Sequence, residues 1–278
     1  MRFRVLGSVE VWDGRTWSVV RAAKQRELLA IMLLRPRRTL DRDWLVETLW
    51  DGEAPASASH LLPHYVWRLR ELLPGGAELL RTVPSGYRFE LVDDDLDRRR
   101  FEWLVTEGRT AARAGRSDQS IGTLSAALDL WRGPALADAR TLPLLGDAAH
   151  HLEQRRLEAR ELLAETLIAA DRPADAVATL EDLTAGEPRR ERPWRLLMLA
   201  LHASGRRPDA LDTFRRLWHV WREQLGIAPS YELRELHRRI LMDDPVLREG
   251  AAPRRTRRPS RRRPLTWRPS TGHSRPYL

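Results

Sequence analysis

The side chains with the richest chemistry gather on one face of a short segment, Ser57–Leu73, which reads SASHLLPHYVWRLRELL. At about 100° per residue, a helix would carry on this face His60, His64, Trp67, Arg68 and Arg70. Guanidinium groups grip anions such as phosphate and can donate two hydrogen bonds to guanine, while imidazole and indole can reach base edges or sugars. The face therefore suits anion recognition, although most amphipathic helices simply show their polar half to water.

The same segment offers a metal pair, and other motifs could signal catalysis. His60 and His64 have the i, i+4 spacing of two metal ligands, but no third ligand is evident nearby and no His-Glu-x-x-His motif occurs. The absence of cysteine excludes disulfides and cysteine-based metal sites. No Gly-x-Ser-x-Gly motif is present, and Lys24 follows no glycine-rich run. We therefore expect no enzyme activity, metal or cofactor.

The other half of the segment is apolar, which predicts an amphipathic helix packed on a core. Its apolar residues are Leu61, Leu62, Tyr65, Val66, Leu69, Leu72 and Leu73. Pro63 cannot donate a hydrogen bond to Ser59 and would clash with that carbonyl in a regular helix. We therefore expect the helix to start between His60 and Leu62, or to bend there.

The flanking elements predict what positions this helix. Short strands are expected over Phe3–Leu6, Val9–Trp12, Thr16–Val20, Leu79–Val83 and Tyr87–Leu91. Two further helices are expected over Ala22–Arg35 and from the N-cap Asp41 to Trp50. The last two strands would form a hairpin around Pro84-Ser85-Gly86 beside the helices, as in a winged helix.

This order resembles the winged-helix domain of OmpR-type regulators, which we assign to residues 1–93. The resemblance implies that the third helix enters the DNA major groove while the hairpin touches the neighbouring backbone or minor groove. On that hairpin, four residues are expected to hold phosphates: Arg81, Thr82, Ser85 and Arg88.

From Asp97 onward the pattern is helical, with an internal repeat. Leu167–Leu183 matches Leu201–Leu217, with Ala176 aligned to Ala210, and Arg113–Leu128 is a weaker third copy. This spacing is that of tetratricopeptide helix pairs, whose stacks bind other proteins on a concave surface. Residues 97–244 are thus predicted to form an all-α repeat domain, either an interaction module or simply a core.

Several separate motifs, in this order, resemble the Streptomyces antibiotic regulatory protein family and its bacterial transcriptional activation domain. They are YVWRLRELL, LLRTVPSGYRFEL, LWRGPALAD, ERPWRLLMLALHASGRRPDAL and EQLGIAPSYELRELHRRIL. The resemblance implies an activator of a secondary-metabolite (antibiotic) gene cluster. It also implies binding to direct repeats near promoters as a homodimer, and recruitment of RNA polymerase holoenzyme.

The third helix departs from that family, because Pro63, His64 and Trp67 stand where glutamine, threonine and serine are usual. Either the recognised site differs, with Trp67 packing on sugar or a thymine methyl, or affinity for DNA is reduced. The competing hypothesis is a tetratricopeptide-like scaffold or sensor with a degenerate winged helix. In both cases the predicted fold class is mainly α with small β, a winged helix followed by helical repeats.

The net charge of +9 is confined to one end of the chain. Residues 1–96 hold 14 basic and 14 acidic side chains, residues 97–247 hold 24 of each, and residues 248–278 hold 10 and 1. This tail should be disordered, and either adds salt-sensitive affinity for DNA or is dispensable. No signal peptide or membrane span is evident. We expect a cytoplasmic, nucleoid-associated protein with double-stranded promoter DNA as partner and no membrane contact.

Overall fold

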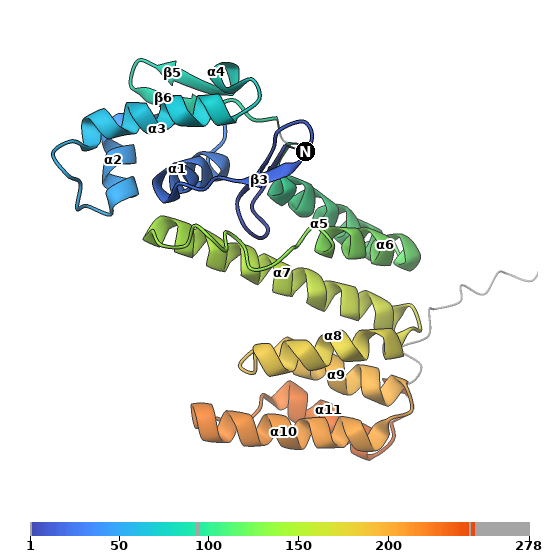
Figure 1. Cartoon of the computed structure of the whole chain (residues 1–278). Coiled ribbons are helices and arrows are strands. Elements are labelled where there is room, and N and C mark those ends of the chain that lie inside the picture. The colour runs from blue at the N-terminus through green and yellow to red at the C-terminus, as the bar shows by residue number, and fades with distance from the viewer. Residues whose placement is uncertain (1, 93–94, 245, 248–278) are drawn as a thin grey trace, which may run out of the picture.

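The computed structural model describes residues 2–92, 95–244 and 246–247, and these build two small sheets followed by a stack of helices (Figure 1). The strands are β1 (Phe3–Arg4), β2 (Glu10–Trp12), β3 (Trp17–Val19), β4 (Thr39–Asp41), β5 (Leu80–Val83) and β6 (Gly86–Phe89). The helices are α1 (Ala23–Leu34), α2 (Arg42–Trp50), α3 (Ala58–Leu72), α4 (Gly76–Leu79), α5 (Asp97–Arg113), α6 (Ser117–Leu128), α7 (Pro143–Ala169), α8 (Pro173–Gly186), α9 (Glu191–Ala203), α10 (Arg207–Leu225) and α11 (Tyr231–Leu241). The mainly helical fold class predicted from the sequence is confirmed.

Both sheets are antiparallel and three-stranded. The first has the order β1-β2-β3, and the second has the order β4-β6-β5. The predicted hairpin is β5–β6, which we call the wing; the sequence analysis missed β4, which pairs Leu40 with Tyr87. Gly86 permits this pairing, because a Cβ there would lie 1.9 Å from the Leu40 carbonyl oxygen. The wing is therefore anchored to the segment that leads into α2.

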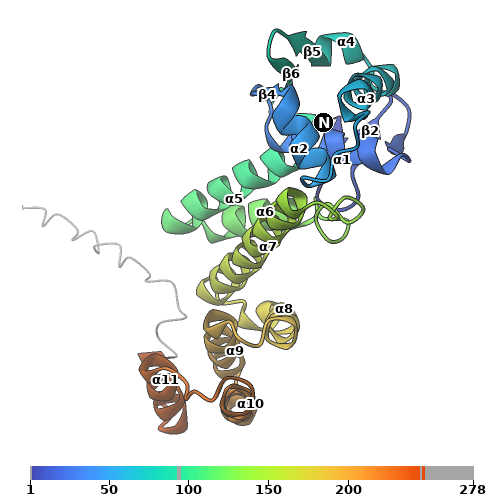
Figure 2. The same ribbon diagram turned by 90° about the vertical axis from the view of Figure 1, so that its left-hand side faces the viewer.

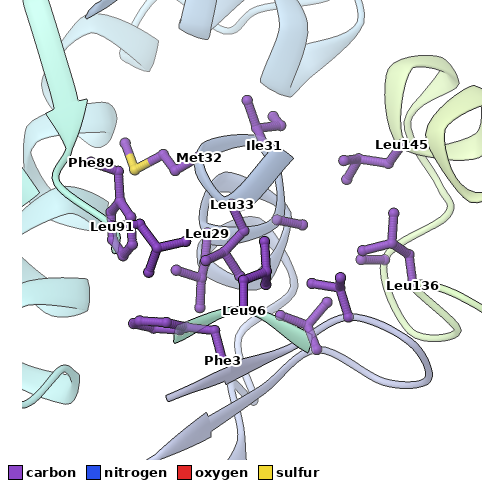
Figure 3. Close-up of a cluster of buried hydrophobic side chains, with 14 of the residues drawn as sticks. Phe3, Leu29, Ile31, Met32, Leu33, Phe89, Leu91, Leu96, Leu136 and Leu145 are labelled. Atoms are coloured by element: carbon purple, nitrogen blue, oxygen red, sulfur yellow. The ribbon is translucent and has the colours of Figure 1, made fainter. Parts of the chain in front are cut away.

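Helix α1 lies at the centre of the N-terminal core. Its residues 28–33 are all fully buried, which is the pattern of a helix surrounded on every side. Phe3 packs on it from the first sheet, Phe89 from the wing and Leu145 from the start of α7 (Figure 3). The winged helix is thus built around α1 rather than around either sheet.

Helix α3 begins earlier than expected. The expected start between His60 and Leu62 is wrong, because α3 begins at Ala58 and contains Pro63. The first turn closes without Pro63: the Ser57 carbonyl accepts hydrogen bonds from the N–H groups of His60 and Leu61, both at 3.0 Å. Proline removes the partner of the Ser59 carbonyl, but Ser59 is exposed, so water can replace that bond. The alternative expectation, a bend at this point, stays a prediction.

Helices α5 to α10 form three hairpins that stack one below the other, α5 on α6, α7 on α8 and α9 on α10, and α11 packs against α9 and α10 (Figures 1 and 2). Each hairpin turns at a left-handed residue, Gly115, Asp171 or Gly205, with φ of 71°, 60° and 76°. These residues occupy equivalent places in the three sequence copies. The aligned Ala176 and Ala210 are fully buried at the helix seams, as expected for small residues that allow close approach.

The buried side chains form two continuous cores that divide within α7. The first core runs from Phe3 to Ala159, and the second runs from Ala164 to Ile240. The winged helix therefore shares its core with α5, the end of α6, the loop between α6 and α7, and the first half of α7. We propose 1–93 and 97–244 as the sequence domains, although their packing is continuous.

A buried hydrogen-bond network, which we call the joint, connects the β1–β2 turn to the helical region. The fully buried Asp97 carboxylate accepts hydrogen bonds from the N–H of Val5 at 2.8 and 3.0 Å and of Leu6 at 3.0 Å, and lies 3.4 Å from Arg132. Burial raises the pKa of this carboxyl, and the hydrogen bonds from Leu6 and Val5 oppose the shift. Three backbone N–H groups of the LWRGPALAD segment donate to the turn carbonyls: Arg132 to Leu6, Leu136 to Val5 and Ala137 to Gly7.

The basic tail, residues 248–278, lies outside the described residues. Within the described part, none of the helices combines the length and apolar character needed to cross a membrane.

Candidate nucleic-acid interface

Helix α3 carries its predicted polar face outward because its other face is held on the core. Leu62, Val66 and Leu69 are buried. Tyr65 is half-buried and stacks on Trp50 of α2, with ring centroids 6.1 Å apart and planes inclined by 24°. The opposite face is thereby fixed in orientation, and α3 itself lies toward the end of the molecule that is opposite α10 and α11 (Figures 1 and 2).

Four of the predicted residues on that face are exposed: His60, His64, Trp67 and Arg68. The His64 and Trp67 rings lie 5.9 Å apart, and the Arg68 guanidinium carbon lies 5.1 Å from the Trp67 ring centroid. The Arg68 guanidinium makes no hydrogen bond or ion pair with another described residue. A cluster of two aromatic rings and one unpaired cation thus stands at the surface, with its hydrogen-bond donors available.

Arg70 behaves differently from its neighbours, because its guanidinium turns toward the wing. Its Nε donates to the Leu80 carbonyl at 2.8 Å, and its Nη2 donates to Thr82 Oγ1, also at 2.8 Å. Two of the predicted residues, Arg70 and Thr82, are therefore brought together as a brace between α3 and β5. The brace fixes the angle between the helix and the wing.

The wing places its two arginines directly opposite each other. Arg81 pairs in register with Arg88 across β5 and β6. Arg88 is bound to Glu90 at 2.5 Å, whereas Arg81 is exposed and donates one long hydrogen bond, 3.3 Å, to the Glu78 carbonyl. Because Glu90 balances the charge of Arg88, Arg81 is the wing arginine whose charge remains available to an anion. Ser85 is exposed in the turn that joins the strands.

One candidate was missed by the sequence analysis, Arg42 at the start of α2. Its N–H donates to the Ser85 carbonyl at 3.2 Å, and its exposed guanidinium lies 5.8 Å from the Tyr87 ring. The helix N-terminus beside it is capped by Asp41, whose carboxylate accepts from Asp43 and Trp44. The available signal was that Arg42 directly follows the predicted N-cap Asp41, which places it at the exposed start of a helix.

The histidines do not form part of a larger ligand set in the described part of the chain. No group of three or more His, Asp or Glu side chains is placed there to hold a metal ion. The imidazoles of His60 and His64 are both exposed on α3, and the His64 ring lies beside Trp67, which in turn lies beside the Arg68 guanidinium. The arrangement is suited to contact with an anionic surface.

Comparison with known families matches both halves of the chain. Residues 18–89 match the model described as "Transcriptional regulatory protein, C terminal". Residues 96–241 match the model described as "Bacterial transcriptional activator domain". The outward face of α3 and the wing together form what we call the α3–wing surface, which lies within the first match. The helical stack lies within the second.

Curated relatives are transcriptional regulators of actinobacteria. The chain is 36% identical over 249 residues to the transcriptional regulatory protein EmbR of Mycobacterium tuberculosis, covering 88% of this chain and 64% of EmbR. It is 34% identical to the transcriptional regulator RedD of Streptomyces coelicolor, covering 91% of this chain and 73% of RedD. It is 32% identical to the regulatory protein DnrI of Streptomyces peucetius, covering 88% of this chain and 93% of DnrI.

A solved structure shares the fold along most of the chain. The structure of Mycobacterium tuberculosis EmbR in complex with a low-affinity phosphopeptide superposes with a TM-score of 0.83 at 34% identity, covering 90% of this chain and 68% of that one. The chain thus matches two regulatory domain models in order, and regulators with both the sequence and the architecture in common. It belongs to the Streptomyces antibiotic regulatory protein family of transcriptional regulators, in which an OmpR-type winged helix precedes a bacterial transcriptional activator domain.

Proposed function

We propose that this protein binds promoter DNA through α3 and the wing, and activates transcription of a secondary-metabolite gene cluster. The observation that carries the proposal is the outward face of α3, where Arg68 makes no hydrogen bond or ion pair within the described protein and lies beside the exposed rings of Trp67 and His64. Arginine reads guanine or grips phosphate, and these are the chemistries that major-groove recognition requires.

The wing and the start of α2 supply the contacts that would fix the register on DNA. Arg81 and Arg42 are exposed beside α3, and phosphate contacts from such residues position a protein without reading its sequence. Arg70 and Thr82 bind each other, so we propose that they set the angle of the wing rather than read bases. Of the remaining residues proposed for the surface, His60 and Ser85 are exposed and Arg88 is half-buried.

The helical repeats would supply the activating half of the function. Repeat stacks bind proteins on the surface that their helices share. We propose that this stack recruits RNA polymerase holoenzyme, and that two copies bind side by side on direct repeats. The relatives RedD and DnrI are named as regulators and support the activator assignment at the level of the family.

The test is retention of DNA fragments from the gene's own neighbourhood, at near-physiological salt and with competitor DNA. We expect the purified protein to retain one promoter fragment, and Arg68→Ala to weaken this binding by about 1–3 kcal/mol. The matched control is Arg116→Ala, an exposed arginine in the α5–α6 turn, which should bind DNA like the unmodified protein.

The opposite outcome has an equally clear form. Uniform, salt-sensitive binding that Arg68→Ala does not change, and that disappears when residues 248–278 are removed, would contradict the proposal. The winged helix would then be degenerate, and the protein would be a scaffold or sensor that acts through its repeats.

A further inference from the structure

A groove in the helical stack encloses a cavity of about 650 Å³ between α5, α7 and α9. These three helices follow one another down the stack, with α7 in contact with both of the others (Figure 2). Cavities of this volume commonly hold a small ligand or a few residues of peptide. The groove lies far along the chain from the α3–wing surface, so it calls for its own explanation.

On the side of the groove formed by α7 and α9, the charged side chains are paired with one another. Arg190 lies 2.8 Å from the buried Glu161 carboxylate, and Arg192 lies 3.6 Å from Glu161 and 2.6 Å from Glu165. The third carboxylate, Glu158, lies 3.3 Å from Arg155. Each acidic group that lines the cavity therefore already has an arginine within the protein.

On the α5 side of the groove, two arginines have no charged partner among the described residues. Arg109 and Arg113, one helical turn apart, both line the cavity. Neither side chain makes a hydrogen bond or an ion pair with a described residue. Two neighbouring guanidinium groups repel each other and have a strong preference for a carboxylate or phosphate placed between them. This wall therefore selects an anionic group.

The rest of the lining defines which kind of anion fits. Ala112, Leu162 and Ala169 give an apolar surface, and the two alanines leave room for an aliphatic side chain beside the arginines. Four arginines and three glutamates line the cavity, a net charge of +1, which matches a single carboxylate better than a polyanion such as nucleic acid. A peptide with separated acidic and aliphatic side chains meets both conditions.

We propose that this groove binds an extended acidic segment of a partner protein, with a side-chain carboxylate between Arg109 and Arg113 and an aliphatic side chain against Ala112 and Leu162. The proposal deepens the recruiting half of the proposed function, on which it rests, and does not require the DNA-reading half. The proposed binding site for the partner therefore lies on α5 and α7.

The experiment selects peptides from a random phage-displayed library on the full-length protein at near-physiological salt. Counter-selection uses the double variant Arg109→Ala/Arg113→Ala. Because this variant keeps residues 248–278, peptides that merely bind the basic tail are removed. We expect the surviving peptides to be enriched in Asp or Glu next to Leu, Ile or Val.

The affinity of a surviving peptide, labelled with fluorescein, is then measured by anisotropy. The double variant should bind it about tenfold more weakly or worse, as expected for the loss of a charge-assisted hydrogen bond. Ala169→Trp, at an exposed position, should weaken binding without a change of charge by filling the groove. The control Arg222→Ala/Arg234→Ala removes two exposed arginines from α10 and α11 and should have no effect.

Three results would overturn the proposal: no surviving peptide, survivors without acidic enrichment, or unchanged binding by Ala169→Trp. Thermal unfolding checks that each variant is folded. Promoter binding by the double variant should be unchanged, so a failure of DNA recognition and a failure of this groove are separable.

Discussion

The joint and the α3–wing surface use the same residue types for opposite purposes. In the joint, Asp97 is fully buried and its carboxylate is engaged by two backbone amides of the β1–β2 turn and by Arg132. On the surface, Arg68 is exposed and has no polar partner within the described protein. The comparison shows that charged groups paired within the protein fix the position of the winged helix, whereas charged groups without an internal partner are available to bind another molecule. The two sets should therefore respond differently to substitution.

The largest expected effect is on stability, from Asp97→Ala. Removal of the carboxylate leaves the buried N–H groups of Val5 and Leu6 without acceptors and leaves Arg132 paired with Glu10 alone, and should lower the free energy of unfolding by about 3–5 kcal/mol. Urea unfolding of the full chain measures the change. Asp118→Ala, which removes an exposed acidic residue in the first turn of α6, is the control and should cost about 1 kcal/mol or less. Equal losses in both variants would contradict an internally satisfied joint.

Arg70 combines features of both regions: it lies on the α3–wing surface, but its guanidinium is hydrogen-bonded within the protein. Arg70→Ala should lower the free energy of unfolding by about 1–2 kcal/mol, because two hydrogen bonds to β5 are lost. Arg70→Lys should not restore this stability, because an ammonium group lacks the planar fork that bridges Leu80 and Thr82. Unchanged stability together with a total loss of DNA binding would show that Arg70 is a reader and not a brace.

Helix α3 and its brace to the wing show how much of the site could be predicted from the sequence. The polar face of α3 was predictable, because amphipathic spacing is a local pattern and its apolar half had to be buried. The brace was not predictable, since it depends on how the chain reverses between Arg70 and Thr82. The start of α3 was misjudged because a local rule for proline was applied without the solvent exposure of Ser59.

The joint shows the same limit over a longer span of chain. The LWRGPALAD motif was noticed, but the residue types alone do not reveal that Arg132 reaches Glu10, 122 positions earlier. Repeats were recognisable because equivalent seam and turn positions recur along the chain. Partners that meet through tertiary packing leave no comparable periodic signal.

Trp67 offers a change on the surface that should leave the core unaffected. The side chain is 48% exposed, so Trp67→Ser should alter the free energy of unfolding by about 0.5 kcal/mol or less. We expect it to change the bound sequence instead, by about 1 kcal/mol at the position that the indole contacts. In vitro selection of DNA with both proteins measures this preference. Identical selected sequences and affinities would show that the indole does not contact DNA.

The smallest expected effect belongs to Arg42, which tests whether the surface extends to the start of α2. Arg42 is exposed and lies beside the wing turn, where its guanidinium is free to contact a phosphate. Arg42→Ala should weaken binding uniformly across DNA sequences and reduce the slope of log affinity against log salt by about 0.9, the value for one phosphate contact. Binding titrations over a series of salt concentrations measure the slope, with Arg116→Ala as the matched control. A changed sequence preference at constant slope would mean that Arg42 contacts a base, and an unchanged slope and preference would place the edge of the surface at the wing. Arg42 is a suitable residue for this test because its backbone N–H holds it to the wing while its guanidinium remains exposed, so the substitution removes the charge without breaking that hydrogen bond.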